Sequence, residues 1–165
     1  MSKIQQKSIC VFSHEDQILV AEYNHYKTGE PFYRPLGGNI EFTEHSKQAL
    51  NREISEELQA DICQVELLDV IENIYHYKEK YSHELMFVYD AEFKDESFYK
   101  KTEFNAFEKT DKRTFKVKWK SLDAFIRGED ILYPQGLLEL LVNEFSIDYP
   151  SNFIENKEAH ASIKY

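Results

Sequence analysis

Residues 37–60 read GGNIEFTEHSKQALNREISEELQA, and the spacing of glycine, acidic and basic residues within this stretch decides the fold. Two glycines open it, and Glu53, Glu56 and Glu57 follow near its end at intervals of three and one. Residues three and four apart share one helical face, so the three carboxylates would project together. Like charges at this spacing cost a bare helix about 0.2 to 0.5 kcal/mol per pair, whereas a divalent cation would bind the same oxygens.

The apolar residues around these acids predict a helix over residues 44–58. Ala49, Leu50 and Ile54 recur at helical spacing, and Thr43 is placed to be the N-cap. Surface helices often carry a Glu-rich face, so an acidic, solvated surface is the alternative interpretation. A glycine pair that allows close backbone approach, a Glu near the helix start and an Arg among the acids favour a site instead.

In this stretch the sequence resembles the signature of the Nudix hydrolases, G-x5-E-x7-R-E-U-x-E-E-x-G-U, where U is a bulky aliphatic residue. The matching residues, all in register, are Gly38, Glu44, Arg52, Glu53, Ile54, Glu56 and Glu57. Gln59 and Ala60 depart from the last two signature positions, glycine and an aliphatic residue. A glycine there suits a left-handed helix exit, so Gln59 predicts a different or a strained exit.

The resemblance implies a function and a set of site residues. Glu53, Glu56 and Glu57 are expected to bind Mg²⁺, for which Mn²⁺ could substitute. Glu44 and Arg52 are expected to interact and brace the catalytic loop-helix-loop. The implied reaction is the attack of a metal-activated water on a phosphorus of a nucleoside diphosphate derivative. Gly37 and Gly38 are expected to bring backbone close to the substrate.

The general base is left open among four carboxylates. Glu56 or Glu53 within the signature is the first candidate, because either lies on the metal-binding face. Some family members use an acid from a later loop, which makes Glu103 and Glu108 the second candidates, although an ordinary solvated loop residue is the favoured interpretation of each.

Residues outside the signature have two interpretations each. Arg34, in the extended segment before the glycines, could bind a substrate phosphate or pair with a surface acid. Glu41 could face the metal site or lie exposed on a strand. A ring could stack on a nucleobase or pack in the core, and the candidates are Tyr75, Tyr77, Tyr81, Phe87, Tyr89 and Phe93. His76 and His83 are expected to be surface residues.

The rest of the chain predicts an α+β fold, which the resemblance specifies as an α/β/α sandwich with a mixed β-sheet. Hairpins are expected over residues 8–23 and 65–93, an extended segment at 32–34, and a break at Gly37 and Gly38. Residues 94–112 lack periodicity and are expected to be a loop, followed by a half-exposed strand at 115–119. Helices are expected at 122–126 and 134–145.

Length and composition predict one domain over residues 1–165. The chain has 42% hydrophobic residues, and a polar tail is expected from about residue 146, with an anchor near Tyr149 or Phe153. A net charge of −10 disfavours general nucleic-acid binding, but permits a polyphosphate substrate held through a metal ion. The aromatic content is compatible with a homodimer, but core packing would use the same residues.

Cysteine usage and hydropathy predict a cytoplasmic protein. Cys10 and Cys63 lack metal-type spacing, no basic and apolar leader opens the chain, and the apolar run at 136–142 is interrupted by Glu139. We expect a Mg²⁺-dependent pyrophosphohydrolase acting on a nucleoside triphosphate, a nucleotide sugar or a related compound. The alternative is a Nudix-fold sensor that binds a nucleotide without hydrolysing it.

Overall fold

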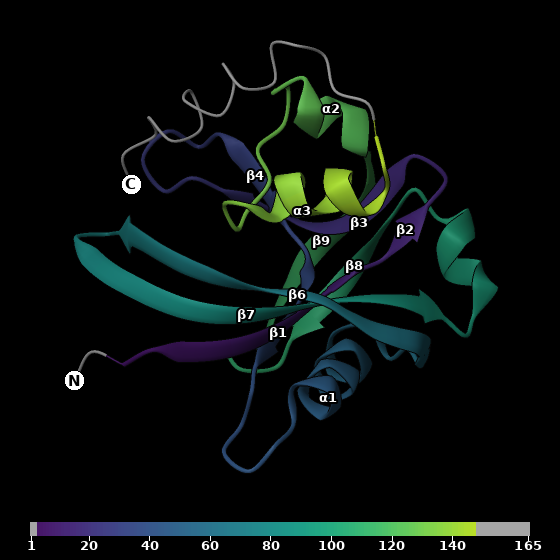
Figure 1. The fold of residues 1–165 in the computed structure, drawn as a ribbon, viewed down its shortest axis with the longest axis horizontal. Helices are drawn as coiled ribbons and strands as arrows, with labels where there is room; N and C mark the ends of the chain where they lie inside the picture. The colour runs from purple at the N-terminus through teal and green to yellow at the C-terminus, as the bar shows by residue number, and fades with distance from the viewer. Residues whose placement is uncertain (1–2, 148–165) are drawn as a thin grey trace.

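The computed structural model describes residues 3–147, which form a sandwich of helices around two curled β-sheets (Figure 1). Helix α1 lies on one side of the strands, and helices α2 and α3 lie on the other. The sheet that carries the first strand is mixed, as expected, because it contains one parallel and two antiparallel strand pairs. The predicted anchor near Tyr149 or Phe153 lies outside the described residues.

The elements follow one another closely along the chain. In order they are β1 (Gln5–Val11), β2 (Ser13–His14), β3 (Gln17–Asn24), β4 (Pro31–Arg34), β5 (Leu36–Asn39), α1 (Ser46–Leu58), β6 (Ile62–Tyr77), β7 (Lys80–Phe93), the 3-10 helix η1 (Glu96–Lys100), β8 (Glu103–Glu108), β9 (Arg113–Ser121), α2 (Leu122–Ile126) and α3 (Leu137–Glu144).

Two sheets divide the strands. The first has the order β5-β1-β7-β6, with β1 parallel to β7. The second has the order β2-β3-β9-β8, and β4 also pairs with β3, at residues 21–24. Strands β4 and β5 follow each other in the chain but belong to different sheets, so the segment around Pro35 carries the chain from one sheet to the other.

Two apolar clusters hold the layers together. Leu50 and Ile54 of α1 are completely buried and pack with residues of both sheets, including Cys10 of β1 and Leu19 of β3. On the other side, Phe125 of α2 and Leu137 and Leu141 of α3 pack against a second set of strand residues. Burial of the apolar side of α1 leaves Glu53 and Glu56 partly exposed, while Glu57 is itself buried.

The first predicted hairpin is wrong in its pairing. The turn at residues 14–16 is present, but it joins only β2 to β3. Strand β1 instead pairs with β5 and β7 in the other sheet. The second hairpin is confirmed and longer than expected, because β6 and β7 pair from Ile62 opposite Phe93 to Tyr77 opposite Lys80, with register shifts between Cys63 and Glu66 and between Leu67 and Asp69.

The glycine pair continues a strand instead of breaking it. Gly37 and Gly38 lie in β5, where they pair with Ile9 and Ser8 of β1. Gly37 has φ +131°, and a Cβ there would overlap the carbonyl oxygen of Ser8. Only glycine allows this close approach of two backbones, so the pair extends the sheet where sequence signals predict a break.

Helix boundaries also differ from expectation. Helix α1 begins at Ser46 with His45 as N-cap, because Thr43 has φ +71° and cannot occupy the extended N-cap conformation. Helix α3 begins at Leu137 instead of Pro134, since the preceding Gly136 has φ +89°. The segment expected to be a loop contains η1 and strand β8, whose pairing with β9 supplies order that its own sequence pattern does not predict.

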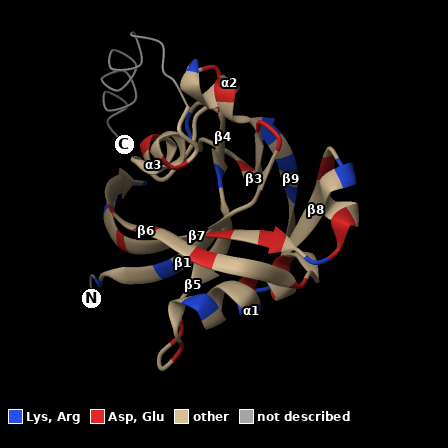
Figure 2. Ribbon diagram, turned by 45° about the vertical axis from the view of Figure 1, so that its right-hand side comes forward, with Lys and Arg blue, Asp and Glu red and all other residues tan. Residues whose placement is uncertain are grey.

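Acidic residues lie on the helices and on both sheets, so the net charge is spread over the molecule (Figure 2). Cys10 and Cys63 are both free. Within residues 3–147 no helix is long and apolar enough to span a membrane.

Candidate active site

Helix α1 and strand β5 together form the candidate active site. The polar side of α1 carries the three acids of the signature, and β5 passes beside them with its two glycines. Leu50 and Ile54 fix the rotation of the helix by their complete burial, which leaves Glu53, Glu56 and Glu57 on the side turned to β5 and β8.

Glu57 is the most buried of the acids, with 8% of its surface exposed. Its Oε2 accepts a hydrogen bond of 3.2 Å from the backbone N–H of Gly37. Burial raises the pKa of Glu57 to about 8, and the charge of Glu53 adds to this rise while the Gly37 N–H opposes it. Such a carboxyl group ionises readily only when a positive charge is close.

Glu53 lies against the other glycine. A Cβ on Gly38 would overlap the carboxyl group of Glu53, so the absence of a side chain at this position makes room for the acid. Burial raises the pKa of Glu53 as well, while hydrogen bonding from Arg52 opposes the rise. Each of the two adjacent glycines therefore contacts a different acid, Gly37 the buried Glu57 and Gly38 the partly buried Glu53.

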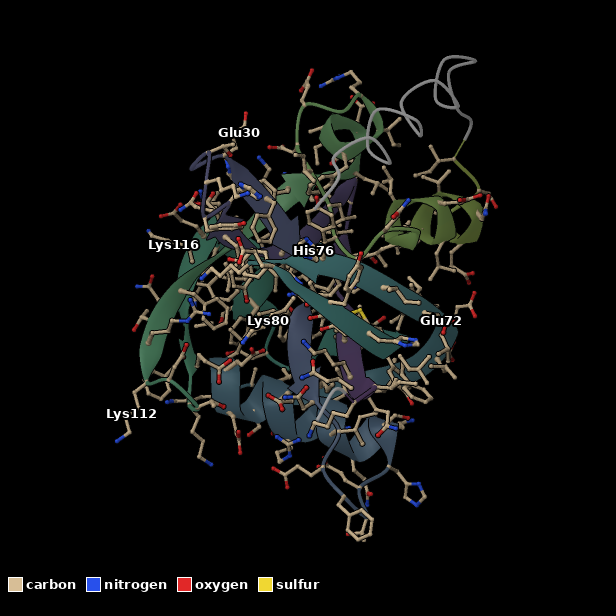
Figure 3. The ribbon with its side chains drawn as sticks, turned by 90° about the vertical axis from the view of Figure 1, so that its left-hand side faces the viewer. Glu30, Glu72, His76, Lys80, Lys112 and Lys116 are labelled. Atoms are coloured by element: carbon tan, nitrogen blue, oxygen red, sulfur yellow. The ribbon has the colours of Figure 1, made fainter. Side chains whose placement is uncertain are left out.

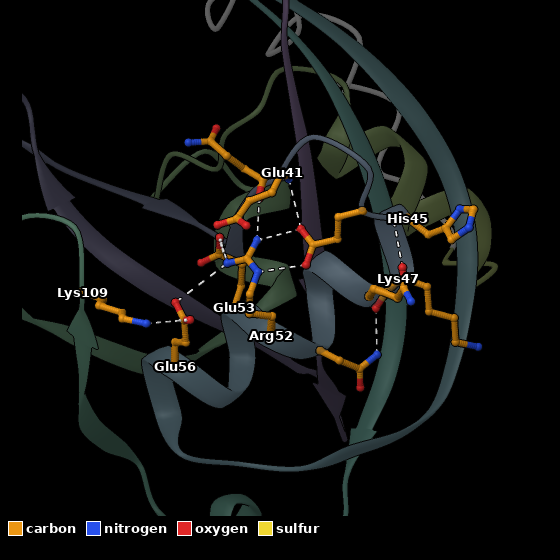
Figure 4. A network of polar contacts seen from close by, with 11 residues as sticks. Glu41, His45, Lys47, Arg52, Glu53, Glu56 and Lys109 are labelled. Carbon is orange, nitrogen blue, oxygen red and sulfur yellow. Dashed lines mark hydrogen bonds and ion pairs between the residues drawn. The ribbon is translucent and has the colours of Figure 1, made fainter.

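Arg52 links the helix to the loop before it (Figure 4). Its Nε donates to Glu44 Oε1 and its Nη2 to Glu44 Oε2, both at 2.9 Å. The same guanidinium donates to Glu53 Oε1 at 2.9 Å and to the carbonyl oxygen of Asn39 at 2.9 Å. The hydrogen bonds from Arg52 hold the pKa of Glu44 below its usual value. This bidentate pair fixes the loop against the first turns of α1.

Glu41 contributes through its backbone. Its N–H donates to Glu44 Oε2 at 3.0 Å, and its carbonyl accepts from the Glu44 N–H at 3.0 Å. The residue lies beyond the end of β5 and is exposed, so it does not occupy the strand position that its alternation with Ile40 suggested.

Both carboxylate oxygens of Glu56 lie near basic side chains. Its Oε1 lies 3.1 Å from Lys109 Nζ, and its Oε2 lies 3.8 Å from Arg52 Nη1 (Figure 4). Lys109 follows β8 and was not foreseen, because the aperiodic sequence around it carries no signal for a strand ending at this helix. Among residues 3–147, no three acidic, His or Cys side chains are gathered closely enough to hold a metal ion as they stand.

Strand β8 separates the two later acids that were base candidates. Glu108, at its end, lies near the helix, since its negative charge contributes to the raised pKa values of both Glu53 and Glu57. Its Oε1 accepts from the Thr110 N–H at 3.0 Å. Glu103, at the beginning of β8, instead forms an ion pair of 2.7 Å with Lys116. The structure therefore brings only Glu108 of these two to the site.

A cavity of about 540 Å³ is lined by residues of strands β3, β4, β6 and β9, and none of the acids of α1 is among its lining residues. Its aromatic lining residues are Tyr23, Tyr26, Phe32, Tyr75, Tyr77, Phe115 and Tyr133, and Arg34 and Arg113 also line it. Two further lining residues are His76 and Lys116, which are labelled in the view of Figure 3. Tyr23 stacks on Phe32 with ring centroids 5.5 Å apart.

Only part of this cavity was predicted from the sequence. Arg34 lines it, and Tyr75 and Tyr77 are the two proposed rings that do so. Tyr81 is 82% exposed and lies elsewhere. Tyr23 and Phe32 escaped notice because the sequence places them on ordinary strands, and only the pairing of β3 with β4 and β9 assembles their rings.

Gln59 takes over the conformation that a glycine would have at the end of the helix. Its φ of 54° and ψ of 37° are left-handed, and its N–H donates to the Ser55 carbonyl at 2.9 Å. Of the two predicted outcomes, the strained exit is the one observed, because a side chain disfavours this conformation.

The model of the NUDIX domain matches residues 5–135, a range that contains all of these residues. No curated protein matches the sequence. A MutT NUDIX hydrolase from Burkholderia pseudomallei has a similar structure, with a TM-score of 0.59, 20% identity, and coverage of 86% of this chain and 98% of that one.

Two further solved structures have the same fold. A NUDIX hydrolase from Nitrosomonas europaea gives a TM-score of 0.60 at 16% identity, covering 91% of this chain and 95% of its own. A MutT protein from Bacillus halodurans gives 0.59 at 19% identity, covering 88% and 85%.

Proposed function

The chain belongs to the NUDIX domain family, and on that premise we propose that it is a divalent-metal-dependent pyrophosphohydrolase acting on a nucleotide derivative. The observation that carries the proposal is the position of Glu57. Glu57 is buried and accepts a hydrogen bond from the Gly37 N–H. The negative charges of Glu53 and Glu108 also act on its carboxyl group. The arrangement is unfavourable for a bare carboxylate and favourable for one that binds a cation.

The donor chemistry fits Mg²⁺, with Mn²⁺ as a substitute. Glu53, Glu56 and Glu57 offer hard oxygen ligands from one helical side, and Gly38 leaves space for the Glu53 carboxyl group. When bound, the metal supplies water activation and neutralises charge on the phosphate oxygens. Glu56 would have to leave Lys109, and Arg52 would keep Glu53 oriented.

Proton removal from the attacking water falls to one of the acids near the helix. Glu53 and Glu56 remain the candidates on α1, and Glu108 is the candidate from β8 because of its place beside them. Glu103 is not a candidate for the general base, because it is paired with Lys116. Glu44 is a bracing residue in this scheme, since both its oxygens are taken up by Arg52.

We propose that the cavity lined by Tyr23, Phe32 and Arg34 receives the nucleoside. Its volume suits a small-molecule site, and rings such as Tyr23 and Phe32 can stack on a base. Nucleoside triphosphates, nucleotide sugars and dinucleoside polyphosphates all carry the required diphosphate. A single domain over the chain and a cytoplasmic location remain our predictions, as does the absence of general nucleic-acid binding.

A nucleotide sensor is the second candidate, and its one sequence hint was Gln59. Because Gln59 adopts the left-handed conformation, the helix exit does not displace the acids on α1. This geometry supports the hydrolase in preference to the sensor.

The test is product release from a panel of dGTP, UDP-glucose and diadenosine tetraphosphate, with Mg²⁺, with EDTA, and with Glu56→Gln. We expect metal-dependent cleavage by the wild type and a loss of about a hundredfold or more in the variant. Glu72→Gln is the matched control, because it removes an exposed carboxylate whose one ion pair within residues 3–147 is with His83. Binding of these compounds without cleavage would favour the sensor, and equal rates in Glu56→Gln would contradict the proposed site.

A further inference from the structure

Glu84 is a completely buried acid that the proposed reaction does not use. It lies on β7, the central strand next to β1, and has 0% of its surface exposed. Burial by itself would raise the pKa of Glu84, but hydrogen bonding and charge from Lys7, together with the charge of Arg34, hold that pKa below its usual value. The buried side chain is therefore an anion surrounded by donors.

Four side chains from three other strands converge on this anion. Lys7 of β1 lies 2.8 Å from its Oε1, and Asn73 of β6 donates to its Oε2 at 3.1 Å. The hydroxyl of Tyr75, also on β6, donates at 3.2 Å. Arg34 of β4 comes from the other sheet and approaches to 3.8 Å. Glu84 thus connects the two sheets by charge.

Three of these partners line the cavity, while Glu84 lies behind them. Arg34, Asn73 and Tyr75 are lining residues, and each is tied to the same buried carboxylate. Because Asn73 donates its Nδ2 to Glu84, the orientation of its amide is fixed. A change at Glu84 would therefore alter the cavity wall without removing any atom that lines it.

The side chain of Arg34 contacts Glu84 but keeps N–H donors for a ligand. The contact, at 3.8 Å, is an ion pair too long for a hydrogen bond, and within residues 3–147 the Arg34 side chain forms no other ion pair or hydrogen bond. A guanidinium carries five N–H donors in a fixed fork, which matches the oxygens of a phosphate. Arg34 is partly exposed at 28%, so these donors can be reached from the cavity.

The phenol of Tyr23 is influenced both by Arg34 and by acids at the candidate active site. Burial raises the pKa of Tyr23, and the positive charges of Arg34 and Arg113 and the negative charges of Glu57 and Glu108 all act on it. Charges of both signs therefore act on the ring of Tyr23, which lines the cavity together with Arg34.

We propose that Glu84 is a positioning residue for substrate, holding Arg34 in the cavity wall so that its guanidinium binds a phosphate of the nucleotide. The inference rests on the proposed function for the identity of the ligand. It adds that affinity for the phosphate chain depends on a buried anion outside the metal-binding helix. A merely structural role would stabilise the sheets without affecting nucleotide affinity.

The first experiment separates binding from turnover in Glu84→Gln. For a panel compound that the wild type cleaves, we expect KM to rise about tenfold or more and kcat to stay within about twofold, because α1 is unchanged. Glu72→Gln, on the same strand pair, should leave both constants unchanged. An unchanged KM in a folded Glu84→Gln protein would overturn the proposal.

A double-variant cycle tests whether Glu84 acts through Arg34. Arg34→Met should raise KM by itself, and Arg34→Lys should restore only part of the affinity because ammonium lacks the planar fork. Adding Glu84→Gln to Arg34→Met should cause little further rise. Fully additive effects would overturn the proposal. If Glu84→Gln does not fold, an unchanged KM in Arg34→Met, whose side chain is partly exposed, would overturn it as well.

Binding of ADP, UDP and GDP in EDTA, measured by calorimetry, distinguishes this proposal from the proposed function. A wild type that binds a nucleotide but cleaves nothing would contradict the hydrolase alone. About tenfold weaker binding by Glu84→Gln would then still support the inference. Absence of binding of all three nucleotides to the wild type would overturn it.

Discussion

The backbone N–H of Gly37 donates to Oε2 of Glu57 at 3.2 Å, joining strand β5 to the third acid of helix α1. The contact exists because Gly37, at φ +131°, lies against Ser8 and turns its amide toward the helix. It is a single neutral donor to a buried carboxylate whose pKa is raised to about 8 by burial and by the charge of Glu53. Stabilisation of the ionised form is therefore left to a bound cation.

Glu57→Gln should remove the response of stability to metal. A ligand that binds only the folded state raises the free energy of unfolding, so 10 mM Mg²⁺ should raise the Tm of the wild type. The variant keeps an oxygen for the Gly37 N–H but loses the negative charge, so the addition of Mg²⁺ should not change the Tm of the variant. Scanning fluorimetry with Mg²⁺ and with EDTA measures this, and an equal rise in both proteins would place the metal elsewhere.

Alanine at the two neighbouring glycines should have opposite consequences. Gly37→Ala puts a Cβ against the Ser8 backbone at φ +131°, so we expect a loss of roughly 3 kcal/mol or more in stability. Gly38→Ala meets only the movable end of Glu53, so it should fold with nearly wild-type stability but lose about tenfold or more in activity. Denaturant unfolding and the cleavage assay compare the two, and equal stabilities would contradict the backbone argument.

Gln59→Gly should stabilise the protein. A side chain in the left-handed conformation costs about 1 kcal/mol, which glycine avoids, so a Tm increase of roughly 2 to 4 °C is expected. Gln59→Ala retains the Cβ and serves as the control. A lower Tm for the glycine variant would mean that the Gln59 side chain itself stabilises the helix end.

Arg52→Lys should weaken the bracing of the loop while keeping the charge. Lysine cannot form the two parallel hydrogen bonds to Glu44 and also reach the Asn39 carbonyl. We expect kcat to fall about tenfold or more, because Glu53 loses its orientation, together with a lower Tm. Wild-type kcat in Arg52→Lys would show that positive charge alone is sufficient.

Acid should reveal the ionised state of Glu84. A carboxyl group whose folded-state pKa lies below its unfolded value stabilises the fold above the unfolded pKa, near 4.5, and loses this effect as the pH falls through the folded pKa. The difference in unfolding free energy between the wild type and Glu84→Gln should therefore be largest above pH 5 and shrink toward pH 3. A constant difference across this range would mean that the pKa of Glu84 is the same in the folded and the unfolded protein, and a difference that moves in favour of the wild type toward pH 3 would mean that Glu84 is neutral in the folded protein.

Local patterns in the sequence determined the elements that bury a periodic face. The acids of α1, the β6–β7 hairpin and helix α2 were predicted because each is encoded by residues close together in the chain. The pairing of Arg52 with Glu44 was expected only from the family resemblance, and the geometry supplies its two hydrogen bonds.

Only the tertiary structure decided how distant segments meet. No local signal shows that β1 leaves its expected hairpin, that β8 orders an aperiodic segment, or that Glu108 and Lys109 reach the helix. The same is true of the buried Glu84, which looks like any polar strand residue until four side chains from three strands surround it. Helical periodicity is a property of neighbouring residues, whereas strand pairing, buried charge and the cavity lined by β3, β4, β6 and β9 depend on contacts between residues far apart in sequence.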